Sequence, residues 1–303
     1  MYTGSAASAT LRRRLLRWYG RSGRDLPWRR TRDPYAVLVS EVMLQQTQVS
    51  RVLPAYTAFL GRFPTLAALS RAALADVLRA WSGLGYNRRA RDLHRIARLH
   101  PGTLPATREA LDALPGIGAY TAGAVVCFSR GAPVAFADTN IRRVLGRALL
   151  GRIATEREAV ALDERLAPRR GADRWHHALM DLGATVCLAR TARCEACPIA
   201  GVCRSRGRVV RAAPRRQAAF ASSDRRVRGR ILALVGVTGG MTLRVLTAEL
   251  GDARTPRLAR ALAAEGLIEI TRAGVRLPQD GLASSAHEQT ATRRRKAGVV
   301  SHP

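Results

Sequence analysis

Lysine is almost absent from this chain of 303 residues, which contains a single one, Lys296. Arginine supplies the other 50 of the 51 basic residues, against only 22 acidic residues. The net charge of +29 predicts a polyanionic partner, nucleic acid before a membrane surface. Because alanine is abundant as well, genome composition accounts for part of the arginine excess, and the charge alone is weak evidence of function.

Long apolar runs are also missing. The longest uncharged apolar stretch, residues 119–128, has about half of the roughly 20 residues that a membrane-spanning helix needs. Residues 1–10 are small and polar and lead into an arginine-rich segment without the apolar core of a signal peptide,. We therefore expect neither a membrane partner nor secretion, with an arginine-rich organellar presequence as the alternative. The expected protein is cytoplasmic and a monomer.

Cysteine is scarce, and four of the five cysteines fall in one short stretch. Cys187, Cys194, Cys197 and Cys203 are separated by six, two and five residues, whereas Cys127 lies in an apolar segment. This clustering indicates a metal site in a reducing compartment and not a disulfide framework. The spacing by itself fits tetrahedral zinc and an iron–sulfur cluster equally well.

Apolar residues recur at helical spacing from residue 11 to about 188, without strand-like alternation, so we predict a mainly α fold,. Asp33 and Pro34 form an N-cap and first turn of a helix that we expect to run to about Leu53. Three further apolar-periodic segments precede an alternating stretch at 267–277, a pattern typical of a winged helix. The expected domains are a disordered N-terminus (1–10), a helical core (11–186), a metal-binding cysteine loop (187–205), a basic linker (206–225), a winged-helix-like module (226–278) and a disordered tail (279–303).

A helix–hairpin–helix motif occupies Leu114-Pro-Gly-Ile-Gly118. Gly116 and Gly118 let the backbone approach a ligand closely, and the amides that open the next helix can hold a DNA phosphate without reading the base sequence. In so basic a chain, the motif predicts DNA binding. A plain helical turn would explain the proline and glycines but not the whole pattern.

This hairpin, followed by Val134-Ala-Phe-Ala-Asp138-Thr-Asn140, resembles the helix–hairpin–helix DNA glycosylase superfamily, whose catalytic aspartate matches Asp138. In bifunctional members, a lysine two residues after the second hairpin glycine attacks the sugar. Tyr120 stands at that position here, and Lys296 lies far away in the tail. The resemblance therefore implies a monofunctional glycosylase.

Three further motifs closely resemble the adenine-specific mismatch glycosylases, the MutY family: Leu26-Pro-Trp-Arg29, Ser40-Glu-Val-Met-Leu-Gln-Gln-Thr-Gln-Val49 and Trp81-Ser-Gly-Leu-Gly-Tyr86. The match covers residues 11–205. It implies a two-lobed helical fold, duplex DNA with A:8-oxoguanine or A:G mispairs as substrate, nucleoid association, and a [4Fe–4S] cluster on the four clustered cysteines.

The resemblance assigns catalytic roles to four residues. Glu41 would protonate N7 of adenine and Asp138 would stabilise the oxocarbenium-like sugar, while Tyr120 and Asn140 would orient these groups. The residues themselves support the first role, because Glu41 lies on the apolar side of its helix, where its pKa should rise. The alternatives are a glutamate paired with an arginine and an Asp138 that only caps a helix.

The remaining positions follow from the same resemblance. Gln45, Gln46 and Tyr86 match residues that wedge into the duplex after the base is flipped out. The expected base pocket consists of Leu26, Trp28, Arg29, Leu44 and His177. Trp28 and Tyr86 are aromatic residues of a type often found in hydrophobic cores, so a purely structural role is the alternative for both. Two positions depart from the family pattern, Asn87 and His177, and His177 leaves the base contact in doubt.

Two other functions remain as rivals: a thymine or uracil mismatch glycosylase on the same fold, and a non-catalytic iron–sulfur DNA-binding regulator. Nothing after Arg206 resembles the Nudix-type domain that senses 8-oxoguanine in full-length relatives. The C-terminal module could replace that reader, but we expect its arginines to contact phosphate instead. These arginines are Arg257, Arg260, Arg272 and Arg276.

Overall fold

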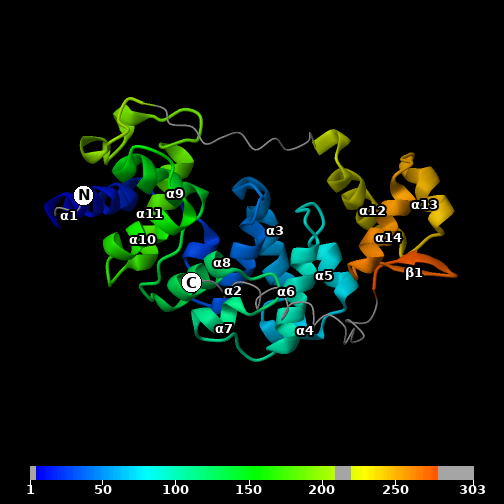
Figure 1. The fold of residues 1–303 in the computed structure, drawn as a ribbon. Coiled ribbons are helices and arrows are strands. Elements are labelled where there is room, and N and C mark those ends of the chain that lie inside the picture. Colours follow the sequence, from blue (N-terminus) through cyan, green and yellow to red (C-terminus); the bar gives the residue numbers. More distant parts are fainter. Residues whose placement is uncertain (1–4, 209–219, 279–303) are drawn as a thin grey trace, which may run out of the picture. The chain divides into compact units, whose positions relative to one another are not determined.

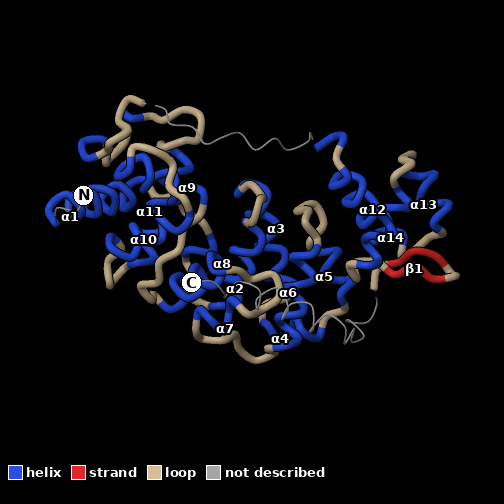
Figure 2. The backbone as a smooth tube through the Cα atoms, viewed as in Figure 1, coloured by secondary structure: helices blue, strands red, loops and turns tan. Residues whose placement is uncertain are grey.

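The structure is a computed structural model that describes residues 5–208 and 220–278. Helices make up nearly all of the regular structure described, and the exception is one short hairpin (Figure 2). The predicted mainly helical fold is confirmed. No helix in the described ranges is long and apolar enough to cross a membrane.

The described residues form two compact units. The first comprises 5–67 and 95–208, and the second comprises 68–94 and 220–278. This division differs from the expected one, because residues 68–94 group with the C-terminal module and not with the rest of the predicted core. The predicted tail (279–303) and most of the predicted linker lie outside the described residues.

Helices of the first unit and its borders are shown in Figure 1. Their bounds are α1 (Ser5–Ser22), α2 (Pro34–Leu44), α3 (Val49–Arg62), α4 (Leu66–Arg71), α6 (Arg88–Leu99), α7 (Arg108–Asp112), α8 (Ala119–Arg130), α9 (Thr139–Leu145), α10 (Glu156–Leu166) and α11 (Ala172–Thr185). Short helical turns cover Pro27–Arg29, Cys194–Ala196 and Ala200–Val202, and a π-helical segment (Gly146–Leu150) continues α9. The expectation of disorder over residues 1–10 is wrong from Ser5 onward, since α1 begins there.

Helix α2 lies at the centre of the first unit. Its N-cap forms as the sequence predicts, with the Asp33 carboxylate accepting from the backbone amides of Tyr35 (3.1 Å) and Ala36 (3.3 Å). Every side chain from Tyr35 to Met43 is buried, which is the mark of a helix surrounded by protein. The predicted extension to Leu53 is wrong, because α2 ends at Leu44 and Gln46 adopts a φ of 56° before α3 begins.

Asp163 on α10 connects three segments of the first unit. Its fully buried carboxylate accepts hydrogen bonds from Trp175 Nε1 (2.6 Å), His176 Nε2 (2.6 Å) and the backbone amide of Phe136 (3.3 Å). Trp175 and His176 belong to α11, whereas Phe136 lies two residues before Asp138. The buried carboxylate thus holds the segment that leads into α9.

The second unit contains α5 (Leu74–Ala80), α12 (Asp224–Thr238), α13 (Leu243–Leu250), α14 (Thr255–Ala264) and a hairpin of β1 (Glu269–Thr271) and β2 (Gly274–Arg276), with a helical turn at Phe220–Ser222. The strands pair antiparallel with Ile270 opposite Val275, and Met241 exchanges backbone hydrogen bonds with Val275. Three helices followed by a hairpin occur in the predicted order. Helix α12 begins at Asp224, inside the predicted linker.

We predict that Asp163→Ala lowers the free energy of unfolding by about 3–5 kcal/mol, because it leaves three buried donors, one of them the ring of His176, without their acceptor,. Urea unfolding followed by circular dichroism measures the change. Glu164→Ala, at the exposed neighbouring position, is the matched control and should shift stability by less than about 0.5 kcal/mol. Equal stability of the two variants would contradict the role given to Asp163.

Candidate active site

Glu41 is a buried acid in the middle of α2, with 6% of its surface exposed. Its pKa is raised to about 7, chiefly by burial and to a smaller extent by the negative charge of Asp138, while a hydrogen bond from Tyr120 and the charge of Arg29 act in the opposite direction. A carboxyl group with such a pKa holds a proton near neutrality and is able to give it up. The predicted elevation of the Glu41 pKa is confirmed.

Tyr120 lies in the first turn of α8, directly after the helix–hairpin–helix turn. Its hydroxyl donates to Glu41, and burial together with the carboxyl groups of Glu41 and Asp138 raises the pKa of Tyr120 well above its usual value. The edge-to-face contact of its ring with Phe136, 5.5 Å between centroids, fixes the ring. Tyr120 is therefore a neutral hydrogen-bond donor to the acid.

Asp138 is the N-cap of α9 and at the same time a neighbour of Glu41. Its carboxylate accepts from the backbone amide of Ile141 and from Asn140 Nδ2, both at 2.7 Å. Burial raises the pKa of Asp138, whereas these hydrogen bonds and the charge of Arg143 favour the ionised form. The cap and the catalytic interpretations of this residue are thus compatible, because the bonds that begin the helix also fix the carboxylate.

Helix α11 approaches Asn140 closely. A Cβ added at Gly183 would lie 2.6 Å from Asn140 Cβ and 3.0 Å from its Oδ1. Only glycine leaves room for Asn140 to reach Asp138, so the position of this asparagine depends on α11.

The residues predicted to form the base pocket lie in the same unit as Glu41. Leu26 and Trp28 are buried, and the Trp28 ring contacts the edge of Tyr56 at 5.4 Å between centroids. Leu44 is half-buried at the end of α2. Arg29 is close enough for its charge to lower the pKa of Glu41.

Arg29 has a structural partner that the sequence did not reveal. Its two terminal nitrogens donate to the buried carboxylate of Asp181 at 2.8 and 2.7 Å, and the same carboxylate accepts from Arg24 Nε at 2.7 Å. Asp181 is completely buried, so these pairs neutralise a charge inside the protein,. His177, one turn earlier on α11, stacks on Phe128 at 4.2 Å, and burial together with Arg29 lowers its pKa well below the usual value. His177 is a neutral, buried ring.

Among the described residues, Gln46 and Tyr86 are the only non-glycine residues with positive φ, at 56° and 49°. Both were predicted to wedge into DNA. A left-handed backbone at a non-glycine residue persists only where its surroundings hold it, and such residues cluster at functional sites. The neighbouring Gln45 donates from Nε2 to the Thr121 hydroxyl at 3.2 Å. Gln46 belongs to the first unit and Tyr86 to the second.

The two hairpin glycines serve different needs. Gly116 has a φ of 72° and therefore satisfies the turn itself,. Gly118 caps α8 with a φ of −120°, which any residue adopts, and a Cβ added there would meet no atom within 4 Å. The free space outside Gly118 is what a close approach of a ligand to the helix N-terminus requires.

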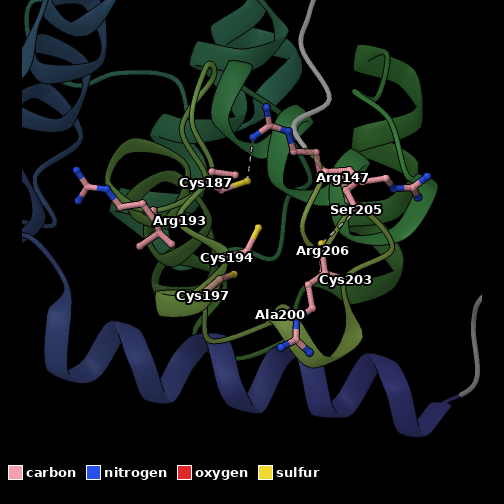
Figure 3. Close-up of a pocket in the computed structure, with 12 residues that line it drawn as sticks. Arg147, Cys187, Arg193, Cys194, Cys197, Ala200, Cys203, Ser205 and Arg206 are labelled. Atoms are coloured by element: carbon pink, nitrogen blue, oxygen red, sulfur yellow. Dashed lines mark hydrogen bonds between the residues drawn. The ribbon is translucent and has the colours of Figure 1, made fainter.

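Cys187, Cys194, Cys197 and Cys203 line one pocket of about 350 Å³, including its open mouth (Figure 3). The pocket is also lined by Arg147, whose Nη1 lies 3.4 Å from Cys187 Sγ and which is almost fully buried. No group of three or more histidine, cysteine or acidic side chains in the described ranges is arranged to hold a single metal ion. Cys127 lies elsewhere, buried on α8.

Two arginines that the sequence analysis missed connect the cysteine loop to the acids. Arg143 donates to Asn140 Oδ1 (2.7 Å), to the Gly183 carbonyl (2.6 Å) and to the Cys187 carbonyl (2.7 Å). Arg147 donates to the carbonyls of Leu188 and Ala189. Their spacing of four residues places both on one face of the helical segment, but among 50 arginines this spacing carries no distinguishing signal,.

Comparison with known proteins decides the family. The family described as HhH-GPD superfamily base excision DNA repair protein matches residues 39–168. The adenine DNA glycosylase of Mycobacterium tuberculosis (strain H37Rv) is 47% identical over 235 residues, 72% of this chain and 76% of the relative. That of Mycolicibacterium smegmatis is 43% identical over 275 residues, 86% of this chain and 93% of the relative. This chain belongs to the adenine DNA glycosylase family.

The adenine DNA glycosylase resemblance of the sequence is thereby confirmed, and the chain is a DNA glycosylase. A match over 86% of the chain necessarily includes residues of the C-terminal module. Among solved structures, a thermostable thymine-DNA glycosylase superposes with a TM-score of 0.61 at 28% identity, over 66% of this chain and 97% of that one. A trapped endonuclease III–DNA intermediate, at 23% identity and a TM-score of 0.59 over 68% of this chain and 97% of that one, supports the fold alone.

We predict that Glu41 titrates near pH 7 and that its two neighbours shift the pKa in opposite directions. Asp138→Asn should lower the pKa of Glu41 because it removes a negative charge, and Tyr120→Phe should raise it because it removes a hydrogen bond that favours the ionised form,. Carboxyl ¹³C chemical shifts measured against pH report both changes. Glu41→Gln identifies the signal as the control, and shifts of the same sign in both variants would contradict the assigned geometry.

Proposed function

We propose that this protein removes adenine mispaired with 8-oxoguanine or guanine from duplex DNA and, as a monofunctional glycosylase, leaves an abasic site. The observation that carries the proposal is the buried Glu41, which retains a proton near neutrality beside Tyr120 and Asp138. Adenine is a poor leaving group as an anion, so its removal requires a proton donor. The relatives named adenine DNA glycosylases support the choice of base.

The reaction begins with adenine flipped out of the duplex, because Glu41 lies inside the protein,. Glu41 donates its proton to N7, and the C1′–N9 bond breaks with its electron pair going to the base. The sugar becomes oxocarbenium-like, and the Asp138 carboxylate stabilises this cation. Water then adds at C1′ and loses a proton, which completes hydrolysis. Tyr120 orients Glu41, and Asn140 orients Asp138.

The absence of a lysine nucleophile supports the monofunctional assignment. Tyr120 occupies the position after the hairpin where bifunctional relatives carry lysine, and its hydroxyl donates a hydrogen bond to Glu41. The sequence has only Lys296, outside the described residues. Without an imine to the sugar, the product strand should stay intact until alkali cleaves it.

DNA binding is assigned to three parts of the chain. The open helix N-terminus at Gly118 suits a phosphate,. The left-handed backbone of Gln46 in the first unit and that of Tyr86 in the second each suit insertion of the side chain into the duplex,. Gln45 is the neighbour of Gln46 in the sequence and is assigned to the same part of the interface. The high positive charge supplies affinity without sequence preference,, and directs the protein to the nucleoid.

We propose that Cys187, Cys194, Cys197 and Cys203 hold a [4Fe–4S] cluster. The four residues line one pocket, and four thiolates are a donor set that an iron–sulfur cluster takes. The resemblance of the sequence to the MutY family favours this cluster over zinc. The almost fully buried Arg147 supplies a positive charge beside Cys187. When bound, the cluster would supply a cross-link that fixes the loop carrying these cysteines.

We predict that the wild-type protein excises adenine from A:8-oxoguanine and A:G duplexes but not thymine from T:G. Single-turnover excision on the three duplexes decides between adenine removal and thymine removal, the second candidate that the 28% identical thymine-DNA glycosylase favours. Glu41→Gln should bind the duplex and lose at least about 100-fold in rate, because the amide lacks the acidic proton.

Asp138→Asn should lose a comparable factor, since it lacks the charge opposite the cation. Glu164→Gln, exposed on α10, is the matched control and should retain the parental rate. Borohydride trapping of the wild type should give no covalent complex. Adenine excision by Glu41→Gln within tenfold of the parent would remove Glu41 from the reaction.

For the metal centre, we predict that anaerobically purified protein contains iron and sulfide in equal amounts, with about four of each per chain. Elemental analysis and acid-labile sulfide assays test this, and Cys197→Ser should lower both values. Cys127→Ser, at the cysteine outside the pocket, is the matched control. One zinc per chain without sulfide would replace the cluster with a zinc site.

A further inference from the structure

Tyr86 lies in the turn between α5 and α6, and two arginines contact its side chain. The guanidinium carbons of Arg89 and Arg225 lie 5.3 and 6.0 Å from the centre of the Tyr86 ring. Arg225 Nη1 also donates to the Tyr86 hydroxyl at 2.9 Å. Arg89 donates in addition to the Gly85 carbonyl at 3.0 Å. The ring is therefore held at its face and at its hydroxyl, while 37% of the residue stays exposed.

Arg225 comes from the C-terminal module, in the first turn of α12, and lies 139 positions after Tyr86 in the sequence. Several bonds fix this module on α5 and α6. The Glu265 carboxylate accepts from Arg88 Nε at 2.8 Å and from Arg228 Nη2 at 2.5 Å. Arg91 donates to the Glu265 carbonyl. The module thus binds the helix that begins directly after Tyr86.

Two hydrogen bonds to backbone carbonyls of the module extend this junction along α5. Arg79 Nε donates to the Gly236 carbonyl at 3.0 Å, and the Ala75 amide donates to the Pro278 carbonyl at 3.1 Å. The Tyr86 turn is consequently flanked by α5 and α6, and both helices make hydrogen bonds or ion pairs with the module. A residue with a positive φ needs such support from its surroundings,.

The arginines expected to contact phosphate are in a different situation. Arg257 Nη2 pairs with Asp224 at 2.7 Å, and Arg276 Nε pairs with Glu269 at 2.8 Å. Two of the four arginines that we expected to contact phosphate are thus paired with acidic residues of the module itself. The most specific contact of the module with a proposed DNA-binding residue is that of Arg225.

We propose that the C-terminal module positions Tyr86 through Arg225 and thereby contributes to recognition of the nucleotide opposite the excised base. Arg225 is a positioning residue that acts through the tyrosine. The part that concerns DNA rests on the proposed function, in which Tyr86 wedges into the duplex. The part that concerns the protein alone, that Arg225 holds the Tyr86 turn, stands independently of it. Loss of the arginine frees the ring and the turn, and the preference between opposite bases changes more than the affinity for DNA.

The test uses the full chain with Arg225→Gln, Tyr86→Phe, the double variant, and Arg244→Gln as control. Arg244 is exposed on α13 of the same module, so its substitution removes an equal charge. Hydrogen exchange of residues 82–89 without DNA measures the turn. Single-turnover excision from A:8-oxoguanine and A:G duplexes, together with the salt dependence of binding, measures recognition.

We expect Arg225→Gln to accelerate exchange of the turn about tenfold, because a hydrogen bond to a charged group is lost. The preference for A:8-oxoguanine over A:G should fall by a similar factor with an unchanged salt slope. The double variant should show little loss beyond that of the larger single variant, since both remove the same bond. Arg244→Gln should leave exchange and preference unaltered.

The opposite result for Arg225→Gln is a uniform loss of affinity for all duplexes, with a smaller salt slope and unaltered hydrogen exchange of the turn. Arg225 would then be a phosphate contact, and the proposal would be overturned. If Arg225→Gln fails to fold, Tyr86→Phe serves in its place, and unchanged exchange of the turn in that variant overturns the proposal. If the wild type excises no adenine, the proposed function fails, and the exchange data still decide whether Arg225 holds the turn.

Discussion

The structure depends on keeping one carboxyl group away from water. Glu41 lies on a helix that is apolar on all sides, and that surrounding is what raises its pKa to about 7. Solvation would restore an ordinary acid, which is ionised at neutral pH. The packing of α8 against α2 also brings Tyr120 to the carboxyl group. Tyr120 is the hydrogen-bonding partner of the acid, and Asp138 contributes a charge that keeps its proton in place.

Asp138 shows how helix capping and the proposed catalytic role use the same contacts. The amide of Ile141 and the side chain of Asn140 satisfy both oxygens, so the carboxylate cannot rotate freely. Asn140 is itself held by Arg143, which bonds to the carbonyl of Cys187. On the other side, Asp163 holds the segment that precedes Asp138. The second acid is thus fixed by the polypeptide before and after it in sequence.

The sequence predicted the fold class, the helix–hairpin–helix turn, and the elevation of the Glu41 pKa, because each depends on local pattern. The cap at Asp33 was readable for the same reason. Helix α2 ended nine residues earlier than expected, since nothing in the composition of residues 45–48 marks the left-handed Gln46.

Contacts between distant residues could not be predicted from local pattern. Asp181 takes up Arg24 and Arg29, and Arg225 reaches Tyr86 across 139 positions. In a chain with 50 arginines, composition offers no means of telling which arginine has which partner.

The junction between the C-terminal module and α5 and α6 limits how this protein can be divided. Residues 68–94 and 220–278 form one compact unit although the first unit separates them in the sequence. The apparent appendage is therefore the second part of a compact unit whose first part lies within the glycosylase sequence. Cutting the chain after the cysteine loop would expose the faces of α5 and α6 that Glu265, Gly236 and Pro278 now cover. The end of the family motifs in the sequence is therefore not a boundary between two compact units of the structure.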